Sequence, residues 1–158
     1  MAGRTCCVTG HREIPKEQIK YVKEALKQEI DTAVANGYTN FISGFAEGVD
    51  QFFAEAVLEK KKGNPDLRLI AAIPTRQRLN SLQKKERESI LLDACSDIVV
   101  IMENYLPSVY EKRNRYMVEN SDRVIAVYDG RKKGGTAGTI RLTHKLNKEL
   151  RTISVIQE

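Results

Sequence analysis

The chain has 158 residues, of which 41% are hydrophobic, and it carries a formal net charge of +5. This length suits one domain over residues 1–158 with a single buried core, and it excludes an arrangement of two full domains. The sequence has no apolar run long enough to span a membrane and no apolar stretch typical of a secretory signal near its start. We therefore expect a cytoplasmic protein without membrane contact, whose positive charge favours an anionic partner.

Short apolar segments alternate with helical patterns in the first part of the chain. Residues 4–9 predict a buried strand that ends at Gly10. From residue 16 to 35, apolar side chains recur at three- and four-residue steps, which places them on one face of a helix. A strand over residues 40–43 and a helix over residues 48–61 repeat this order.

The second part continues the same alternation. Its expected elements are a strand over 67–73, a polar helix over 79–94, a strand over 97–102, a helix over 108–120, a strand over 123–128, a helix over 138–150 and a strand over 152–156. Almost wholly apolar strands separated by helices are typical of a parallel sheet that is covered on both faces. The sequence therefore predicts a single α/β domain of Rossmann-like type, with three layers, a mainly parallel sheet of five to six strands and helices on both faces.

The cysteines do not suggest a disulfide framework. Their number, three, is odd, and the adjacent Cys6 and Cys7 point to opposite faces if they lie on a strand. We expect these two residues and Cys95 to be small core residues. We also expect no metal ion and no cofactor.

Ligands of open parallel sheets bind beyond the carboxyl ends of the strands, so the loops at these ends are the candidate binding elements. The first loop contains Thr9, Gly10, His11 and Arg12. Gly10 permits a tight turn and close backbone approach, while Thr9 and Arg12 can donate to a phosphate or a sugar; His11 alone is not diagnostic. The alternative is structural, with Gly10 needed only for the turn and Arg12 in a surface ion pair.

The second loop joins a strand to a helix and contains Ser43, Gly44, Glu47, Gly48 and Asp50. Its backbone amides and the positive end of the following helix can hold an anion. The glycine spacing differs from the dinucleotide-binding fingerprint, so this loop alone is a weak signal. Asp50 can accept hydrogen bonds from ribose hydroxyls, or it can simply complement the helix dipole.

The third loop is the strongest local signal. It runs from Asp129 into a turn with Gly134 and Gly135, which Thr136 and Thr139 follow. Glycines before a helix start leave backbone amides open to a phosphate, and threonine hydroxyls add donors. The turn lacks the Lys-Ser or Lys-Thr ending of a P-loop, which argues against magnesium-dependent hydrolysis of a triphosphate.

Four motifs occur in order between residues 5 and 139, as parts of a resemblance that covers nearly the whole chain: TCCVTGHR, FISGFAEGVDQFFAE, AAIPTRQ and RNRYMVENSDRVIAVYDGRKKGGTAGT. They resemble the YpsA-like branch of the SLOG superfamily, which also includes DNA-processing protein A (Smf) and the LOG phosphoribohydrolases. The resemblance implies a Rossmann-like fold and a pocket for nucleotides or nucleotide-derived ligands. From the residues alone, the RN pair at 113–114 is as consistent with a solvent-exposed position as with a ligand contact. The positions that match the family pattern are Thr9, Gly10, Arg12, Gly44, Gly48, Asp50, Asn114, Asp129, Gly134, Gly135 and Thr136.

The sequence differs from the pattern of this family in two places. It has no tryptophan, whereas relatives often carry one shortly after the residues that match Thr75 to Gln77. The LOG enzymes use a glutamate of their glycine-rich loop to cleave a base from a ribose phosphate, and the stretch GGTAGTIRL has no glutamate at the matching place. Because N-glycosidic cleavage needs a carboxylate, Glu47, Asp50 and Asp129 are the candidate substitutes.

These patterns favour a protein that binds a nucleotide or a nucleotide-derived, ADP-ribose-like small molecule as a sensor, carrier or sequestering protein. The alternative is an N-glycosidic hydrolase, a phosphoribohydrolase, that acts on a nucleotide-like substrate. Single-stranded DNA binding is a further alternative, but the scattered basic residues and the lack of an array of strand aromatics argue against a nucleic-acid partner. A homo-oligomer is also consistent with the sequence, since Rossmann-like domains of this size often pair through helices.

Overall fold

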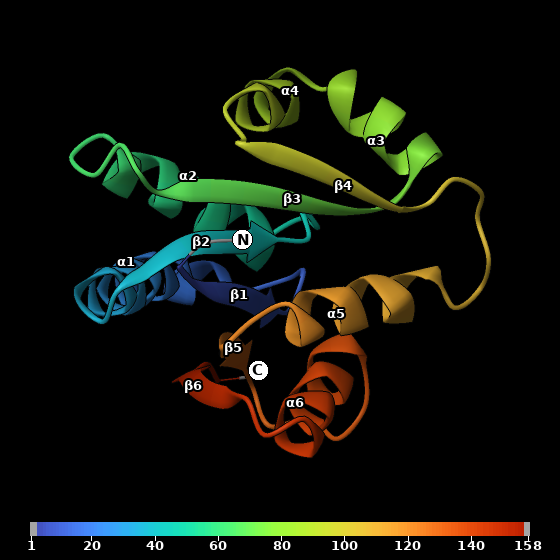
Figure 1. Cartoon of the computed structure of the whole chain (residues 1–158). Coiled ribbons are helices and arrows are strands. Elements are labelled where there is room, and N and C mark those ends of the chain that lie inside the picture. Colours follow the sequence, from blue (N-terminus) through green and yellow to red (C-terminus); the bar gives the residue numbers. More distant parts are fainter. Residues whose placement is uncertain (1–2, 157–158) are drawn as a thin grey trace.

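A computed structural model describes residues 3–156 and shows one six-stranded sheet (Figure 1). All paired strands are parallel, and their spatial order is β4-β3-β2-β1-β5-β6. The strands are β1 (Arg4–Gly10), β2 (Tyr38–Ser43), β3 (Arg68–Thr75), β4 (Asp97–Met102), β5 (Arg123–Tyr128) and β6 (Glu149–Ser154).

Helices cover both faces of the sheet. They are α1 (Ile19–Ala35), which the short 3-10 helix η1 (Lys16–Gln18) precedes, α2 (Val49–Lys61), α3 (Arg76–Gln83), α4 (Glu86–Asp93), α5 (Val109–Glu119) and α6 (Gly135–Lys145). Figure 1 shows α5 and α6 together on the face opposite α1 and α2. The predicted single three-layer α/β domain is confirmed, with a sheet that is wholly parallel.

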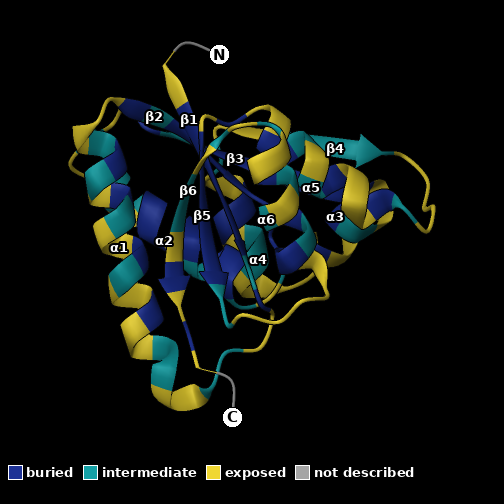
Figure 2. Ribbon diagram, turned by 90° about the horizontal axis from the view of Figure 1, so that it is seen from below, coloured by how far each residue is buried: buried dark blue, intermediate teal, exposed yellow. Residues whose placement is uncertain are grey.

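The core lies in two clusters because successive side chains of a strand point to opposite faces. Cys6 packs in the cluster under α1 and α2, whereas Cys7 packs with Met117 of α5 on the other face. Both thiols are buried and free, as expected, and Cys95 is half-buried. In Figure 2 the central strands are dark blue, while the edge strand β4 is teal, so burial falls toward that edge. No helix within residues 3–156 is long and apolar enough to cross a membrane.

The polar helix expected over 79–94 is two helices, α3 and α4, which meet at Lys84 and Lys85. Between Leu82 and Ile90 the sequence is QKKERES, without an apolar side chain. A single straight helix would therefore lose its core contacts over two turns. The break lets both helices bury their leucines on the same cluster.

The last helix ends earlier than expected. Leu142, Leu146 and Leu150 recur every four residues, which predicts one helix, yet Leu150 lies on β6. Asn147 adopts a positive φ of 56°, the left-handed conformation that commonly ends helices. All three leucines still pack against the same cluster, so their spacing reflects a shared contact and not a shared helix.

The strand order reverses direction between β1 and β5. From β1 the chain proceeds outward to β4, then returns to place β5 on the other side of β1. Such a reversal leaves a crevice beyond the carboxyl ends of the two strands, because their connections depart to opposite faces. The fold therefore positions the loops after β1 and β5 side by side.

Candidate functional site

A cavity of about 830 Å³ opens beyond the carboxyl ends of four adjacent strands, β2, β1, β5 and β6. The loops that follow these strands line it, together with residues of α5. Small-molecule sites commonly measure about 300–1,000 Å³. The cavity thus has the size and the place in the sheet of a ligand site.

Most of the residues that the sequence singles out meet at this cavity. Those that line it are Thr9, Gly10, His11, Arg12, Asp50, Asn114, Asp129, Gly134, Gly135 and Thr136. Among the described residues, those that do not line it are Ser43, Gly44, Glu47, Gly48 and Thr139. Glu47 is exposed, and the hydroxyl of Thr139 donates to the carbonyl of Gly135 at 2.8 Å within α6.

Two glycines allow the loops after β1 and β2 to pack against each other. A Cβ on Gly10 would lie 2.5 Å from the side chain of Val49, and one on Gly48 would lie 2.4 Å from the carbonyl oxygen of Arg12. Gly48 also has a φ of +79°, which L side chains rarely adopt. Loop packing alone therefore accounts for both glycines.

Arg113 joins the two glycine-bearing turns, and it is only 6% exposed. Its Nη1 donates to the carbonyl of Gly44 at 2.7 Å, and its Nε donates to Oδ1 of the neighbouring Asn114 at 2.9 Å. The amide nitrogen of Asn114 lies 3.8 Å from the point that a Cβ on Gly135 would occupy. The turns over 44–48 and 134–136 thus converge on one α5 pair, which the sequence did not distinguish from solvent-exposed residues.

Asp50 contributes a buried carboxylate to the cavity. Its Oδ2 accepts a hydrogen bond from the backbone N–H of Ala46 at 3.1 Å, and its carbonyl accepts one from the hydroxyl of Ser43 at 2.8 Å. Burial raises the pKa of Asp50, while the charge of Arg113 and the Ala46 bond oppose that rise. The Ala46 bond orients the carboxyl group, and within residues 3–156 no hydrogen bond engages Oδ1, which can accept from a ligand.

The start of α6 presents backbone amides to the cavity. Gly134 has a φ of +104° and precedes the helix, and Gly135 and the buried Thr136 form its first turn. A Cβ on Gly135 would meet nothing closer than 3.8 Å, so packing within the chain does not require a glycine there. The bare backbone at Gly135 keeps the helix N-terminus, where anions bind, open to the cavity.

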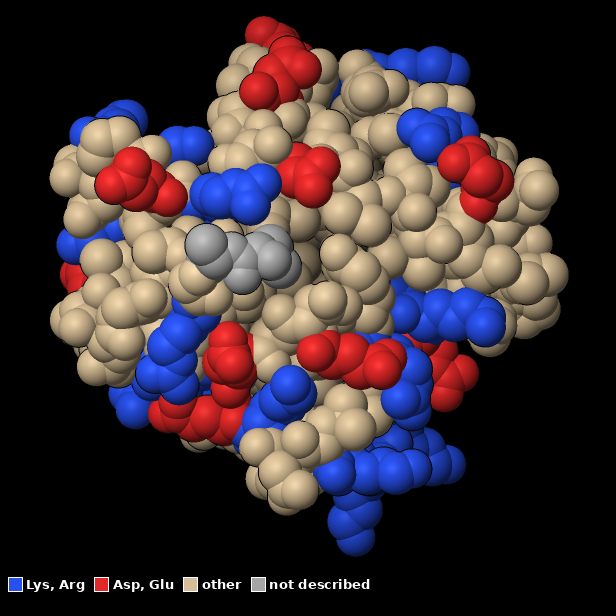
Figure 3. Space-filling view, viewed as in Figure 1, with Lys and Arg blue, Asp and Glu red and all other residues tan. Residues whose placement is uncertain are grey.

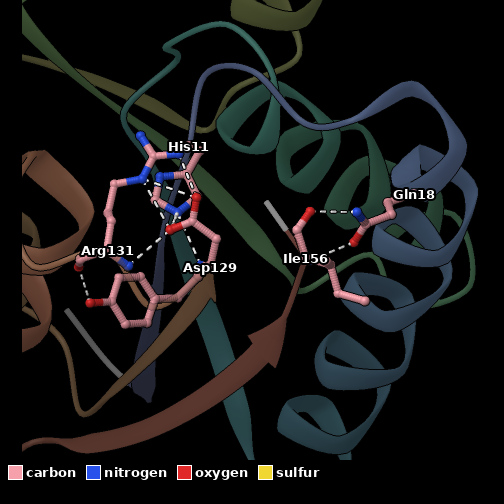
Figure 4. Close-up of polar contacts among 6 residues, drawn as sticks. His11, Gln18, Asp129, Arg131 and Ile156 are labelled. Carbon is pink, nitrogen blue, oxygen red and sulfur yellow. Dashed lines mark hydrogen bonds and ion pairs between the residues drawn. The ribbon is translucent and has the colours of Figure 1, made fainter. Parts of the chain in front are cut away.

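Asp129 organises its own loop (Figure 4). Its carboxylate accepts from the backbone N–H of Arg131 at 3.1 Å and from the guanidinium Nε of the same residue at 3.0 Å. These side-chain hydrogen bonds lower the pKa of Asp129 to about 2. Its backbone N–H donates to Nε2 of His11 at 3.2 Å, and the same Nε2 lies 3.1 Å from Oδ1 of Asp129. Burial lowers the pKa of His11, while the charge of Asp129 opposes that shift.

Arg12 lines the cavity and is exposed. Its guanidinium and that of Arg113 each lie 5.6 Å from the ring centroid of Tyr110, which is 40% exposed. Within the part of the chain that the structure describes, Arg12 forms no ion pair, contrary to the structural alternative for this residue. The cavity therefore combines an uncommitted cation, an exposed aromatic ring and helix N-terminal amides.

The YpsA family (YspA SLOG family) matches residues 6–157. The chain belongs to this family. The match spans the glycine-bearing loops, so the resemblance seen in the sequence is confirmed.

The family's relatives include proteins without an assigned activity. The uncharacterized SPbeta prophage-derived protein YoqJ of Bacillus subtilis (strain 168) is 31% identical over 108 residues, which cover 60% of this chain and 63% of YoqJ. The UPF0398 protein BH1768 of Halalkalibacterium halodurans is 24% identical, covering 83% of this chain and 71% of its own. A UPF0398 protein of Ligilactobacillus salivarius is 25% identical over 154 residues, which cover 90% of this chain and 84% of that protein. The matched region is thus less than two thirds of YoqJ.

Two solved structures share the SLOG-family fold of this chain. DNA processing protein A from Helicobacter pylori, studied for its binding of single-stranded DNA, has a TM-score of 0.67 at 20% identity, over 94% of this chain and 64% of that one. TM1055 has a TM-score of 0.62 at 17% identity, over 93% of this chain and 72% of TM1055. At such identities the likeness concerns the fold alone.

Replacing Asp129 of this SLOG-family protein by asparagine should lower the midpoint of thermal unfolding by a few degrees at neutral pH, because asparagine cannot bind the Arg131 guanidinium as an ion. The folded pKa of Asp129 lies below its ordinary value of 3.8, so its contribution is complete above that value and is lost as the pH falls toward about 2. In calorimetric scans from pH 6 to 2.5, the thermal midpoints of the wild type and Asp129→Asn should approach each other as the pH falls. Asp93→Asn, at the exposed end of α4, is the control and should leave the midpoint unchanged.

Proposed function

We propose that this protein binds a nucleotide or a nucleotide-derived, ADP-ribose-like molecule, as a sensor, carrier or sequestering protein. The observation that carries the proposal is the cavity at the strand reversal, which the N-terminus of α6 lines together with Arg12 and Tyr110. Phosphate bound at a helix N-terminus gains both the backbone donors and the helix dipole. Family membership supports the same class of ligand.

Each part of such a ligand has a counterpart among the lining groups. The amides of residues 134–136 can hold a phosphate, and Arg12 can add a charge-assisted hydrogen bond. Asp50 can accept from ribose hydroxyls through Oδ1, because Oδ2 is engaged with the backbone. The ring of Tyr110 lines the same side of the cavity and lies 5.6 Å from the Arg12 guanidinium, which it helps to position.

The carboxylates favour binding over catalysis. Asp129 is saturated by the Arg131 backbone and side chain, which makes it a poor base or nucleophile. Glu47 lies outside the cavity lining. Of the three carboxylates considered for cleavage, Asp50 alone lies in the cavity with an oxygen to spare.

Mass spectrometry of small molecules released from the natively purified protein tests the proposal, and a phosphate-bearing nucleotide derivative is the expected result. In titration calorimetry, Arg12→Ala should weaken binding of ADP-ribose about 10- to 100-fold, because a hydrogen bond to a charged group contributes about 1.5–3 kcal/mol. Arg115→Ala, on the exposed side of α5, is the matched control and should bind as the wild type does. No binding of any phosphate-bearing nucleotide by the wild type would refute the proposal.

Hydrolysis of an N-glycosidic bond is the second candidate, and the buried Asp50 is the observation that favours it. Burial raises the pKa of this carboxyl group, which favours the protonated form that a general acid needs. Chromatography of nucleotides and ADP-ribose after incubation with the protein would detect a released base. Release that the wild type shows and Asp50→Asn lacks would replace the binding proposal by this one.

Binding of single-stranded DNA has weaker support. On the face shown in Figure 3, basic and acidic side chains are interspersed, and the densest basic group lies at its lower edge, over α6. Electrostatic binding to a nucleic-acid backbone weakens steeply as salt rises, whereas a pocket ligand is less affected. Titration of a labelled oligonucleotide at two salt concentrations separates the two modes.

A further inference from the structure

The wall of the cavity beside β6 differs in chemistry from the remainder. Ile14 and Pro15, which follow β1, and Val155 and Ile156, which follow β6, contribute to it, and all four side chains are apolar. The opposite side carries the polar groups of α2 and α5 described above. A bound molecule therefore meets an apolar surface on one side and charged or amide groups on the other.

The side-chain amide of Gln18 fixes the backbone of this wall (Figure 4). Its Nε2 donates to the carbonyl of Ile156 at 2.6 Å, and its Oε1 accepts from the N–H of Ile156 at 2.8 Å. The pair of bonds resembles the pairing between neighbouring strands, but with a side chain on one side. It joins two segments that are 138 positions apart in the sequence into one surface.

Ile156 is exposed although its backbone is fixed. Its residue is 74% exposed, whereas the neighbouring Val155 is 7% exposed. A single exposed isoleucine needs no explanation. This one lines a cavity next to Ile14 and Pro15, so it forms part of a preorganised apolar surface, which a ligand can cover without first ordering it.

The order of the strands places this wall and the polar side of the cavity on either side of the α6 amides. Residues 134–136 follow β5, which lies one strand from β6 and two strands from β2. Because adjacent strands are about 4.8 Å apart, the four strands extend over roughly 14 Å. A phosphate at the start of α6 therefore has room on both sides, toward Ile156 and toward Asp50.

We infer that the ligand is two-ended, with a phosphate or diphosphate linking a nucleoside to a second polar group, and that residues 14–15 and 155–156 form the subsite for its base. Gln18 is the positioning residue of this subsite, because it holds the backbone of Ile156 without lining the cavity. The second polar group lies toward Asp50 and Arg113. This inference rests on the proposed nucleotide binding and specifies its ligand class.

Titration calorimetry with three probes tests it: ADP-ribose, AMP and ribose 5-phosphate. The wild type should bind ADP-ribose at least about tenfold more tightly than AMP, and AMP more tightly than ribose 5-phosphate. Ile156→Ala should weaken ADP-ribose and AMP about tenfold, since it removes three carbons from a covered apolar surface, and should leave ribose 5-phosphate unchanged. Gln18→Ala should reproduce this pattern by releasing the wall.

Ile90→Ala is the matched control, because Ile90 on α4 is 62% exposed and lies outside the cavity. It should leave all three affinities unchanged, and the thermal midpoints of the free variants show that each is folded. Equal weakening of ribose 5-phosphate, or equal affinity of the wild type for ribose 5-phosphate and ADP-ribose, would overturn the two-ended subsite while leaving nucleotide binding intact. If the wild type binds none of the probes, this inference fails, and the proposed function fails with it if no other phosphate-bearing nucleotide binds.

Discussion

Replacing Gly48 by alanine should lower the free energy of unfolding by about 2–5 kcal/mol. Two costs add at this position. Its φ of +79° is one that L side chains rarely adopt, and the new Cβ would lie 2.4 Å from the backbone carbonyl oxygen of Arg12, which cannot rotate away. Urea unfolding followed by circular dichroism measures the change. Because the clash moves the loop that carries His11 and Arg12, the variant should also lose affinity for a cavity ligand.

Gly37→Ala separates the two costs. Gly37 has a φ of +90°, but a Cβ there would meet nothing within 4 Å. It should therefore show only the conformational penalty, about 1 kcal/mol. If Gly48→Ala destabilised no more than Gly37→Ala, the contact between the loops after β1 and β2 would not be a close one.

The fold could be predicted because each strand and most helices carry their own signal. Residues 97–102 and 123–128 are apolar runs between polar segments, and both strands have the expected bounds. The errors fall where one pattern has two physical causes. Leu150 continues a helical spacing, yet it contacts the core from a strand, and only the positive φ of Asn147 separates the two cases.

The site could be predicted in part. Glycine-bearing loops at strand ends can be recognised in the sequence. The sequence does not show which glycine is needed for packing within the chain and which leaves room for a ligand. Gly48 and Gly135 both precede or begin a helix in the sequence, and only the distances from a Cβ on each glycine to neighbouring atoms distinguish their roles. One feature of the sequence could have predicted that Arg113 is buried. It lies four residues from Val109 and four from Met117, and these three residues share the buried face of α5.

Arg113→Met should lower the free energy of unfolding at neutral pH by about 1–3 kcal/mol, the cost of leaving the buried Gly44 carbonyl without its donor and Asp50 without a neighbouring positive charge. The guanidinium is buried, donates to the Gly44 carbonyl and faces the carboxyl group of Asp50. Methionine fills a similar volume and replaces neither contact. Arg115→Met on the exposed side of the same helix is the control, and its effect should stay within about 0.5 kcal/mol.

The pH dependence identifies which contact of Arg113 matters. Burial raises the pKa of Asp50, and removing Arg113 raises it further. A carboxyl group whose folded pKa exceeds its unfolded value contributes stability that is complete below the unfolded pKa and is lost as the pH rises through the folded one. The difference in the free energy of unfolding between the wild type and Arg113→Met, here called the deficit, should thus be largest at neutral pH. It should shrink as the pH falls below the raised pKa of Asp50. With Asp50→Asn in both proteins the deficit should be smaller and constant with pH. A deficit that is constant in the native background would instead assign the stabilisation to the Gly44 hydrogen bond and to packing.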